Sequence, residues 1–288
     1  MNTDRFVVPH DRKIRLEDYD PGFTGAFKNK KDAKKKLKHD ILRLAELQDV
    51  LYAHDVYSLL IIFQAMDAAG KDSTIKHVMS GVNPQGCQVF SFKAPSAEEL
   101  DHDYLWRCMQ RLPERGRIGI FNRSYYEEVL VTRVHPEILA RQKLPSDAHR
   151  HIWKHRFREI NDFERYLHDN GTRVVKFFLH VSKEEQRQRF LDRINRPDKH
   201  WKFSANDVKE RAHWDDYMAA YEDMFNHTST PYAPWHIVPA DHKWFTRGAV
   251  AEILISTLES IDLHYPVVTV EHREQLEESR IHLENEPR

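Results

Sequence analysis

The amino-acid sequence predicts an α/β fold in which helices cover a mostly parallel sheet of about five strands. Short apolar runs recur along the chain, and three of the connections between them are long and helical in period. The first run also leads through a loop of small residues containing Gly and Lys into a helical pattern. The runs that predict strands span residues 57–64, 117–122, 174–181 and 235–239, with a further strand predicted at 88–92.

Helices are predicted before and between these runs. The longest covers residues 26–53, where five apolar residues recur at helical spacing: Leu37, Ile41, Leu44, Leu47 and Leu51. Other helix starts carry a Ser followed three residues later by an acid, the spacing of a capping box: Ser96 and Glu99, Ser124 and Glu127, Ser182 and Glu185, and Ser204 and Asp207. Strands that alternate with such helices are typical of right-handed crossover connections.

The chain is predicted to form a single domain, residues 1–288, with a helical extension over about 1–54. Its 288 residues are 40% hydrophobic, enough for one substantial core, and no internal repeat or low-complexity linker divides them. Residues 1–24 look irregular, because Pro9 and Pro21 interrupt regular structure there.

Composition also predicts where the protein works. No window approaches the ~18 uninterrupted apolar residues of a membrane span, and the first residues lack the apolar core of a secretory signal. The two cysteines, Cys87 and Cys108, are too few for a disulfide framework and are most simply buried thiols of a reducing compartment. We therefore expect a soluble, cytoplasmic protein with no membrane partner.

Lysine is concentrated on one side of the first helix, although the whole chain carries a net charge of only −1. The residues are Lys30, Lys31, Lys34, Lys35 and Lys38. Two interpretations stay open: a solvated face of an amphipathic helix, and a contact with a polyanion.

The loop after the first strand predicts a phosphate-binding P-loop. Such loops direct backbone amides and a helix N-terminus at phosphate oxygens, while a Lys reaches the transferred group. The candidate ligand-binding residues are Ala68, Ala69, Gly70, Lys71, Asp72 and Ser73. Against the pattern GxxxxGK(S/T), Ala65 replaces the first Gly and Asp72 replaces the hydroxyl that binds magnesium, so Asp67 becomes the candidate metal ligand. The alternative is an ordinary strand-to-helix turn capped by Asp.

A second candidate group follows the strand at 117–122. In P-loop enzymes this strand usually ends in an acid near the magnesium, whereas here it ends in Asn122. Arg123 offers a fork of donors that suits phosphate oxygens, or it forms a salt bridge beneath the sheet. Glu127 has a role in the capping box of Ser124, so Glu128 is the freer acid for a metal or for orienting Arg.

A third group of basic residues follows the strand at 174–181, and Pro197 interrupts its helix. It predicts a lid over about 183–215 that closes over phosphates, with solvated helix charge as the alternative. Arg193 is the catalytic candidate, and Arg189 and Lys202 are the candidates for phosphate binding. The whole group comprises Arg187, Arg189, Arg193, Arg196, Lys199 and Lys202.

Several long motifs resemble the polyphosphate kinase 2 family, most closely its class III branch. They include "QAMDAAGKDSTIKHVMSGVNPQGCQVFSFKAPSAEEL", "GIFNRSYYEEVLVTRVHP", "KFFLHVSKEEQRQRF" and "WKFSANDVKERAHWDDYMAAYED". Together with shorter motifs they cover about residues 15–265, which is far more specific than a lone Gly-Lys loop. In class III the second catalytic strand also ends in Asn, as it does here at Asn122.

The resemblance implies a three-layer P-loop kinase fold with a lid, similar to thymidylate kinases. By position, Asp67, Ala69, Gly70 and Lys71 would hold phosphate and metal, Asn122 and Arg123 would occupy the Walker B region, and residues 187–202 would belong to the lid. The implied metal is Mg²⁺, with Mn²⁺ as an alternative.

The implied activity is reversible phosphoryl transfer from inorganic polyphosphate to AMP and ADP, which yields ADP and ATP. Guanine nucleotides are further candidate acceptors. No nucleic acid partner is expected. The resemblance also implies that the protein forms dimers or tetramers. Two alternatives stay open: an ATP-dependent nucleoside monophosphate kinase, and a noncatalytic module that binds polyanions.

Overall fold

A computed structural model describes residues 1–25, 27 and 29–286. Its centre is a five-stranded sheet in the order β2-β3-β1-β4-β5, and every neighbouring pair is parallel. The strands are β1 (Ser58–Gln64), β2 (Cys87–Ser91), β3 (Ile118–Asn122), β4 (Thr172–His180) and β5 (Trp235–Pro239). Each lies within two residues of its predicted range, so the prediction of a parallel α/β sheet is confirmed.

The strand order places the end of β1 in the middle of the sheet. β1 pairs with β3 on one side and with β4 on the other, and in the register Phe63 lies opposite Asn122 and Phe177. The carboxyl ends of these strands therefore meet at one edge, where ligands bind in open α/β sheets.

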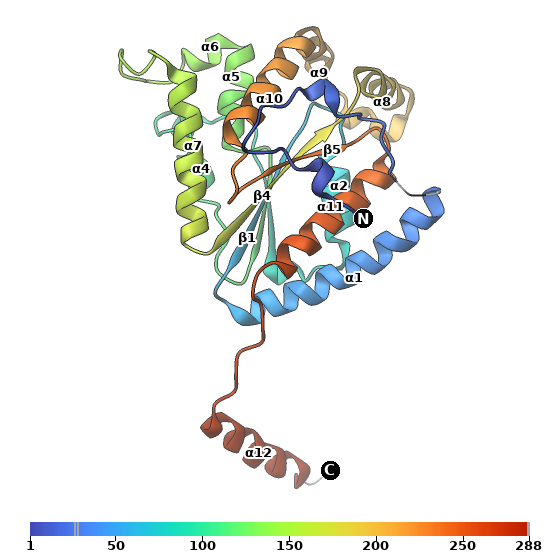
Figure 1. Cartoon of the computed structure of the whole chain (residues 1–288), viewed down its shortest axis with the longest axis vertical. Coiled ribbons are helices and arrows are strands. Elements are labelled where there is room, and N and C mark those ends of the chain that lie inside the picture. The colour runs from blue at the N-terminus through green and yellow to red at the C-terminus, as the bar shows by residue number, and fades with distance from the viewer. Residues whose placement is uncertain (26, 28, 287–288) are drawn as a thin grey trace.

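Helices cover both faces of the sheet, which gives three layers (Figure 1). One face carries α1 (Lys30–His54), α2 (Lys71–Val78) and α11 (Lys243–Glu259), and α11 contacts both of the others. The other face carries α7 (Ile152–Asp169), α10 (Trp214–Thr228) and the short α5 (Val131–Val134).

The first helix begins later than predicted. Its predicted first residue, Ala26, lies outside the described residues, and α1 starts at Lys30 because the Asn29 side chain accepts hydrogen bonds from the amides of Lys31 and Asp32. The predicted apolar side packs inward, with Leu44, Leu47 and Leu51 buried. The five predicted lysines are all exposed.

The N-terminal residues are largely irregular, as predicted, with two short 3₁₀ turns, η1 (Asp4–Phe6) and η2 (Leu16–Asp18). They still pack on the domain. Phe6 and Val8 are buried, and the amide of Val8 donates to the carbonyl of Trp235 in β5 at 2.8 Å. This segment therefore covers the β5 edge of the sheet.

The remaining elements connect the strands. They are 3₁₀ turns η3 (Met79–Gly81), η4 (Pro84–Gly86), η5 (Tyr125–Val129), η6 (Pro197–Lys202) and η7 (Arg211–His213), and helices α3 (Ala97–Leu100), α4 (Trp106–Met109), α6 (Pro136–Leu139), α8 (Lys183–Asn195) and α9 (Ala205–Glu210). All four predicted capping serines begin a helical element. α8 ends at Asn195 and Pro197 is the first residue of η6, so the chain turns where the sequence predicts an interrupted helix.

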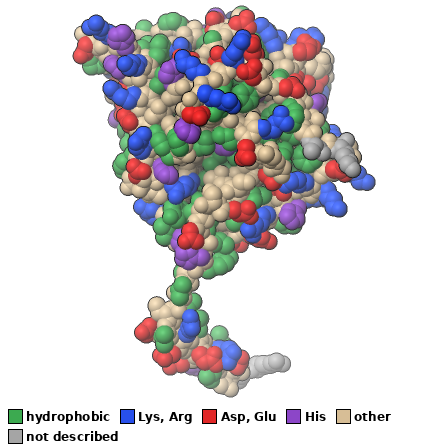
Figure 2. All heavy atoms as spheres, in the orientation of Figure 1, with side chains coloured by type: hydrophobic (Ala, Val, Ile, Leu, Met, Phe, Trp, Pro, Cys, Tyr) green, Lys and Arg blue, Asp and Glu red, His purple; other side chains and the backbone are tan. Residues whose placement is uncertain are grey.

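The last helix, α12 (Val270–Glu284), projects away from the domain and buries no residue (Figure 1). No described helix is long and apolar enough to span a membrane. Figure 2 shows acidic and basic side chains interspersed over the visible face, in agreement with the small net charge.

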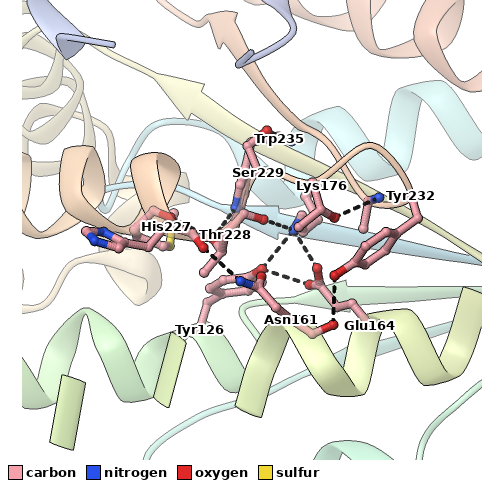
Figure 3. A network of polar contacts seen from close by, with 12 residues as sticks. Tyr126, Asn161, Glu164, Lys176, His227, Thr228, Ser229, Tyr232 and Trp235 are labelled. Atoms are coloured by element: carbon pink, nitrogen blue, oxygen red, sulfur yellow. Dashed lines mark hydrogen bonds and ion pairs between the residues drawn. The ribbon is translucent and has the colours of Figure 1, made fainter. Parts of the chain in front are cut away.

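A buried polar network joins the sheet to the helices on the face of α7 and α10 (Figure 3). Lys176 of β4 is fully buried, and its Nζ donates to Glu164 Oε2 at 2.6 Å, to the hydroxyl of Tyr126 at 2.9 Å and to the carbonyl of Thr228 at 2.7 Å. Glu164 Oε1 accepts from the hydroxyls of Tyr125 and Tyr126, each at 2.8 Å. The three donors of the ammonium group are all used. Because Tyr125 and Tyr126 begin η5, the network fixes the chain that leaves the end of β3.

Candidate active site

The loop between β1 and α2 has the backbone of a phosphate cradle. Gly70 has φ 112° and Ala68 has φ 62°, both in the left-handed region. The amides of Gly70, Lys71, Asp72 and Ser73 donate to no protein acceptor within the described residues. These amides are the free donors that a helix N-terminus offers to an anion.

Lys71 begins α2 and lies buried behind the loop. Its Nζ donates to the carbonyl of Ala65 at 2.7 Å, and no acidic side chain pairs with it among the described residues. Burial, and then the nearby positive charge of Arg123, lower its pKa. The ammonium group is therefore a cation that an added phosphate would stabilise.

Arg123 and Asp67 meet across the site, as predicted for two site residues from different strand ends. Arg123 Nη2 donates to Asp67 Oδ1 at 2.7 Å. Burial disfavours the charge on Arg123, but Glu127 and Asp67 outweigh it, so the pKa of the guanidinium is raised. Arg123 also has φ 64°, an uncommon conformation for a side chain of this size, and such residues are frequent at functional sites.

Asn122 and Asp72 contact each other at the positions where this loop departs from the usual pattern. Asn122 Nδ2 donates to Asp72 Oδ1 at 2.6 Å. An acid at the end of β3 would repel Asp72, whereas the amide is a neutral donor to it. The two departures from the P-loop pattern thus compensate each other.

The two glutamates after Ser124 do not divide their roles as the sequence suggested. The predicted capping contact of Glu127 is wrong: Ser124 accepts from the amide of Tyr126, and the Glu127 carboxylate accepts from Gln64 Nε2 at 3.0 Å. Glu127 lines the cavity beside Arg123. Sequence reasoning missed this acid, because the Ser124 spacing assigned it another role.

Glu128 is buried and paired away from the P-loop. It accepts from Arg156 Nε at 3.0 Å and from Gln142 Nε2 at 2.7 Å. Burial raises its pKa, although the charge of Arg156 opposes the shift. Glu128 therefore orients an Arg, one of the two predicted possibilities, but the partner is Arg156 and not Arg123. Its predicted catalytic role stays a prediction.

Arg189 of α8 lies behind the loop, where all five of its N–H donors are used. Nη1 donates to the carbonyls of Ala68 and Ala69, Nη2 to those of Ala240 and Asp241, and Nε to Glu185. In this arrangement no donor is left for a phosphate oxygen. Arg189 thus positions the loop, and its predicted direct contact with a phosphate stays untested.

The other two predicted residues of the lid segment lie nearer its surface. Arg193 Nη1 donates to Asp207 Oδ2 at 3.4 Å, and Asp207 lines the cavity. Lys202 is exposed, with its Nζ 4.8 Å from the centre of the Trp201 ring. The predicted roles of both residues stay predictions.

A cavity of about 630 Å³ opens beside Asp67 and Arg123. Its walls combine aromatic and charged side chains, among them Tyr104, Arg107, Arg141, Tyr217 and Tyr221. This volume and lining are typical of a site for a small organic ligand.

The site can hold a divalent cation only with help from a ligand. No group of three His, Cys, Asp or Glu side chains that could bind a metal occurs within the described residues. Asp67 uses one carboxylate oxygen for Arg123, and its Oδ2 accepts no hydrogen bond from the described residues. Mg²⁺ commonly binds through one or two carboxylates together with phosphate oxygens, so the donor set fits that ion when phosphate is present.

Comparisons with known proteins agree with this geometry. A family model described as "Polyphosphate kinase 2" matches residues 27–265. The chain is 50% identical to an "ADP-polyphosphate phosphotransferase" of Rhodopseudomonas palustris, over 97% of this chain and 98% of that one. It is 44% identical to an "AMP/ADP-polyphosphate phosphotransferase" of Meiothermus ruber, over 91% and 95%.

A solved structure gives the same result for the fold. The crystal structure of polyphosphate kinase 2 from Arthrobacter aurescens TC1 matches with a TM-score of 0.86 and 40% identity, over 96% of each chain.

Proposed function

The chain belongs to the polyphosphate kinase 2 family, and from this premise we propose that it transfers the terminal phosphoryl group of inorganic polyphosphate to AMP and ADP. The observation that carries the proposal is the phosphate cradle at Gly70 and Lys71 beside a cavity large enough for a nucleotide. The names of the two relatives differ in their acceptors, so ADP is the acceptor common to both.

In the proposed reaction an oxygen of the acceptor's terminal phosphate attacks the terminal phosphorus of the polymer in line. The new P–O bond forms as the bond to the bridging oxygen breaks, and that oxygen keeps the electron pair and leaves as the end of a polymer one unit shorter. Little covalent chemistry is needed from the protein, because positioning and charge neutralisation dominate phosphoryl transfer. In the reverse direction ATP or ADP would lengthen the polymer.

Lys71 and Arg123 would supply the charge. The loop amides and Lys71 would bind the transferred phosphoryl group, while Arg123, held by Asp67, would face the acceptor's phosphate from the cavity. Arg193, on the segment we propose as a lid, would add charge on closure, with Lys202 at its outer edge.

Mg²⁺, or Mn²⁺ in its place, is proposed as the cofactor. Asp67 is its proposed protein ligand, and the ion would supply neutralisation of phosphate charge. A cytoplasmic location and assembly into a homo-oligomer stay predictions, and sedimentation would test the second.

One incubation tests the function. The protein is mixed with Mg²⁺, AMP and long-chain polyphosphate in the absence of ATP, and products are followed by phosphorus NMR. We expect ADP to appear first and ATP to follow. Product formation only after ATP is added would favour an ATP-dependent nucleoside monophosphate kinase, and polymer binding without any product would favour a noncatalytic module.

A further inference from the structure

The start of α11, which packs against α2, carries two cations, Lys243 and Arg247, that form no ion pair among the described residues. Arg247 of α11 donates through Nη2 to Ser73 Oγ at 2.7 Å, and its Nε is buried without a hydrogen-bond partner among the described residues. A buried guanidinium donor without an acceptor is costly, and in native proteins it calls for an explanation. A bound anion would satisfy it.

Lys243 lies one helical turn before Arg247, close to the P-loop. The two carbonyls that precede α11, those of Ala240 and Asp241, share the guanidinium of Arg189 with the loop carbonyls of Ala68 and Ala69. The start of α11 is thereby joined to the back of the phosphate cradle.

Neither Lys243 nor Arg247 has an acidic side chain of its own to pair with in the described part of the chain. The acid that acts on Lys243 is Glu185, which already pairs with Arg189 at 2.8 Å. Burial lowers the pKa of both groups, and for Lys243 the nearby Arg189 lowers it further. Lys243 is exposed and Arg247 is partly buried, so the observation that indicates an anion site is the buried Nε of Arg247, which has no hydrogen-bond partner among the described residues.

The lysines of α1 continue this positive surface. α1 and α11 run parallel, because Lys36 pairs with Glu252 and Arg43 pairs with Glu259, seven residues later in each helix. Lys34 and Lys38 share a helix face with Ile41, which contacts Gly81 just after α2. These two lysines are exposed and form no ion pair within the described part of the chain.

We propose that this face discriminates donors by chain length: Lys243 and Arg247 bind the phosphates next to the transferred one, and Lys34 and Lys38 bind phosphates farther along the polymer. The inference rests on the proposed function, and it names the residues that recognise the length of the polyphosphate donor. A short donor would reach only the cations of α11, whereas a long one would reach both sets.

The discrimination is tested with tripolyphosphate and long-chain polyphosphate as alternative donors. Arg247→Gln and Lys243→Gln should each raise the KM of both donors about tenfold, the value of one charge-assisted hydrogen bond, with a smaller change in kcat. The double variant Lys34→Gln/Lys38→Gln should raise the KM of the long donor only. Lys154→Gln and Arg158→Gln, exposed on α7 across the sheet, are matched controls and should change neither.

Two outcomes would overturn the inference: an unchanged KM in the α11 variants, or a KM of the long donor that rises no more than the KM of tripolyphosphate in the α1 variant. Thermal unfolding shows whether each variant is folded. If the native protein makes no product from either donor, the proposed function fails instead. Calorimetric titration with long-chain polyphosphate then still decides whether Lys243 and Arg247 form an anion site.

Discussion

Two clusters of buried or partly buried charge in this protein differ in how they are satisfied. Around Lys176 each donor of the ammonium group has a protein acceptor (Figure 3). Glu164 also accepts from the hydroxyls of Tyr125 and Tyr126. Around the P-loop, Lys71 has one carbonyl acceptor, and Arg247 keeps a buried Nε without a partner among the described residues.

The contrast separates charge that serves the fold from charge that serves a ligand. The network around Lys176 is closed, because its donors all have protein acceptors, so an added anion would not stabilise it and breaking it leaves a buried charge uncompensated. The cluster around the P-loop is open, because some of its donors have no protein acceptor, and a bound phosphate would satisfy them. Mutations should therefore reduce stability in the first cluster and turnover in the second.

The largest effect is expected at Lys71. Lys71→Ala should lower kcat by about a thousandfold, because the cation that meets the transferred phosphoryl group is lost. Stability should change little, since this lysine makes one hydrogen bond to a carbonyl. Steady-state rates with polyphosphate and ADP, beside a thermal melt, measure both. Near-native turnover would exclude the assigned role.

The opposite result is expected at Lys176. Lys176→Met should lower the free energy of unfolding by about 3–5 kcal/mol, because Glu164 is left buried without its cation. Urea unfolding measures the loss, and the double variant Lys176→Met/Glu164→Gln should recover part of it. Below its melting temperature the single variant should keep most of its kcat. A stable variant without activity would erase the distinction between the clusters.

Asp67 belongs to the charge cluster at the P-loop and is also the proposed ligand of Mg²⁺. Asp67→Asn should lower kcat by about a hundredfold, since the substitution removes the charged partner of Arg123 and the proposed ligand of Mg²⁺. The Mg²⁺ concentration for half-maximal rate should rise at the same time. An unchanged Mg²⁺ requirement would assign the metal to other ligands.

The smallest effect concerns pH and the closed cluster. His236 of β5 is buried beside Lys176, and burial lowers its pKa from 6.5 to about 4. The unfolded chain therefore binds this proton more readily, and stability should fall as the pH decreases from about 6.5 toward about 4. His236 alone should account for about 2 kcal/mol between about pH 7 and about pH 5.

His180, whose pKa burial also lowers to about 4, should contribute a similar amount. Urea unfolding of His236→Phe should thus show a shallower pH dependence than the native protein, but not a flat one. An unchanged slope would mean that His236 titrates normally in the folded state.

Much of this organisation could be predicted from the sequence. Strands such as 58–64 and 235–239 are short apolar runs between helical segments, so periodicity locates them. The loop at Gly70 and the strand end at Asn122 also carry local signals. Parallel strands bring their carboxyl ends together, so these signals predicted one site.

The rest depends on contacts between distant parts of the chain. The spacing from Ser124 predicted a capping role for Glu127, and only the fold shows that its carboxylate faces Gln64 and the cavity. Arg189 lies in a basic helix that suggests phosphate binding, yet its guanidinium donates to backbone carbonyls of two loops, those of Ala69 and Ala240. Lys243 lies in one of the shorter motifs that carry the family resemblance and Arg247 lies in none, but the motifs gave neither residue a role, and only their position beside α2 indicates one.

The contrast between the closed network around Lys176 and the open cluster around the P-loop is tested most directly by the change in melting temperature on adding polyphosphate. Thermal unfolding is measured with and without long-chain polyphosphate, in the absence of nucleotide, for the native protein and for Lys243→Gln/Arg247→Gln. Polymer should raise the melting temperature of the native protein and of Lys176→Met, because it binds the folded state, and most of this rise should be lost in the α11 variant. An equal rise in the native protein and the α11 variant, or no rise in the native protein, would contradict the account.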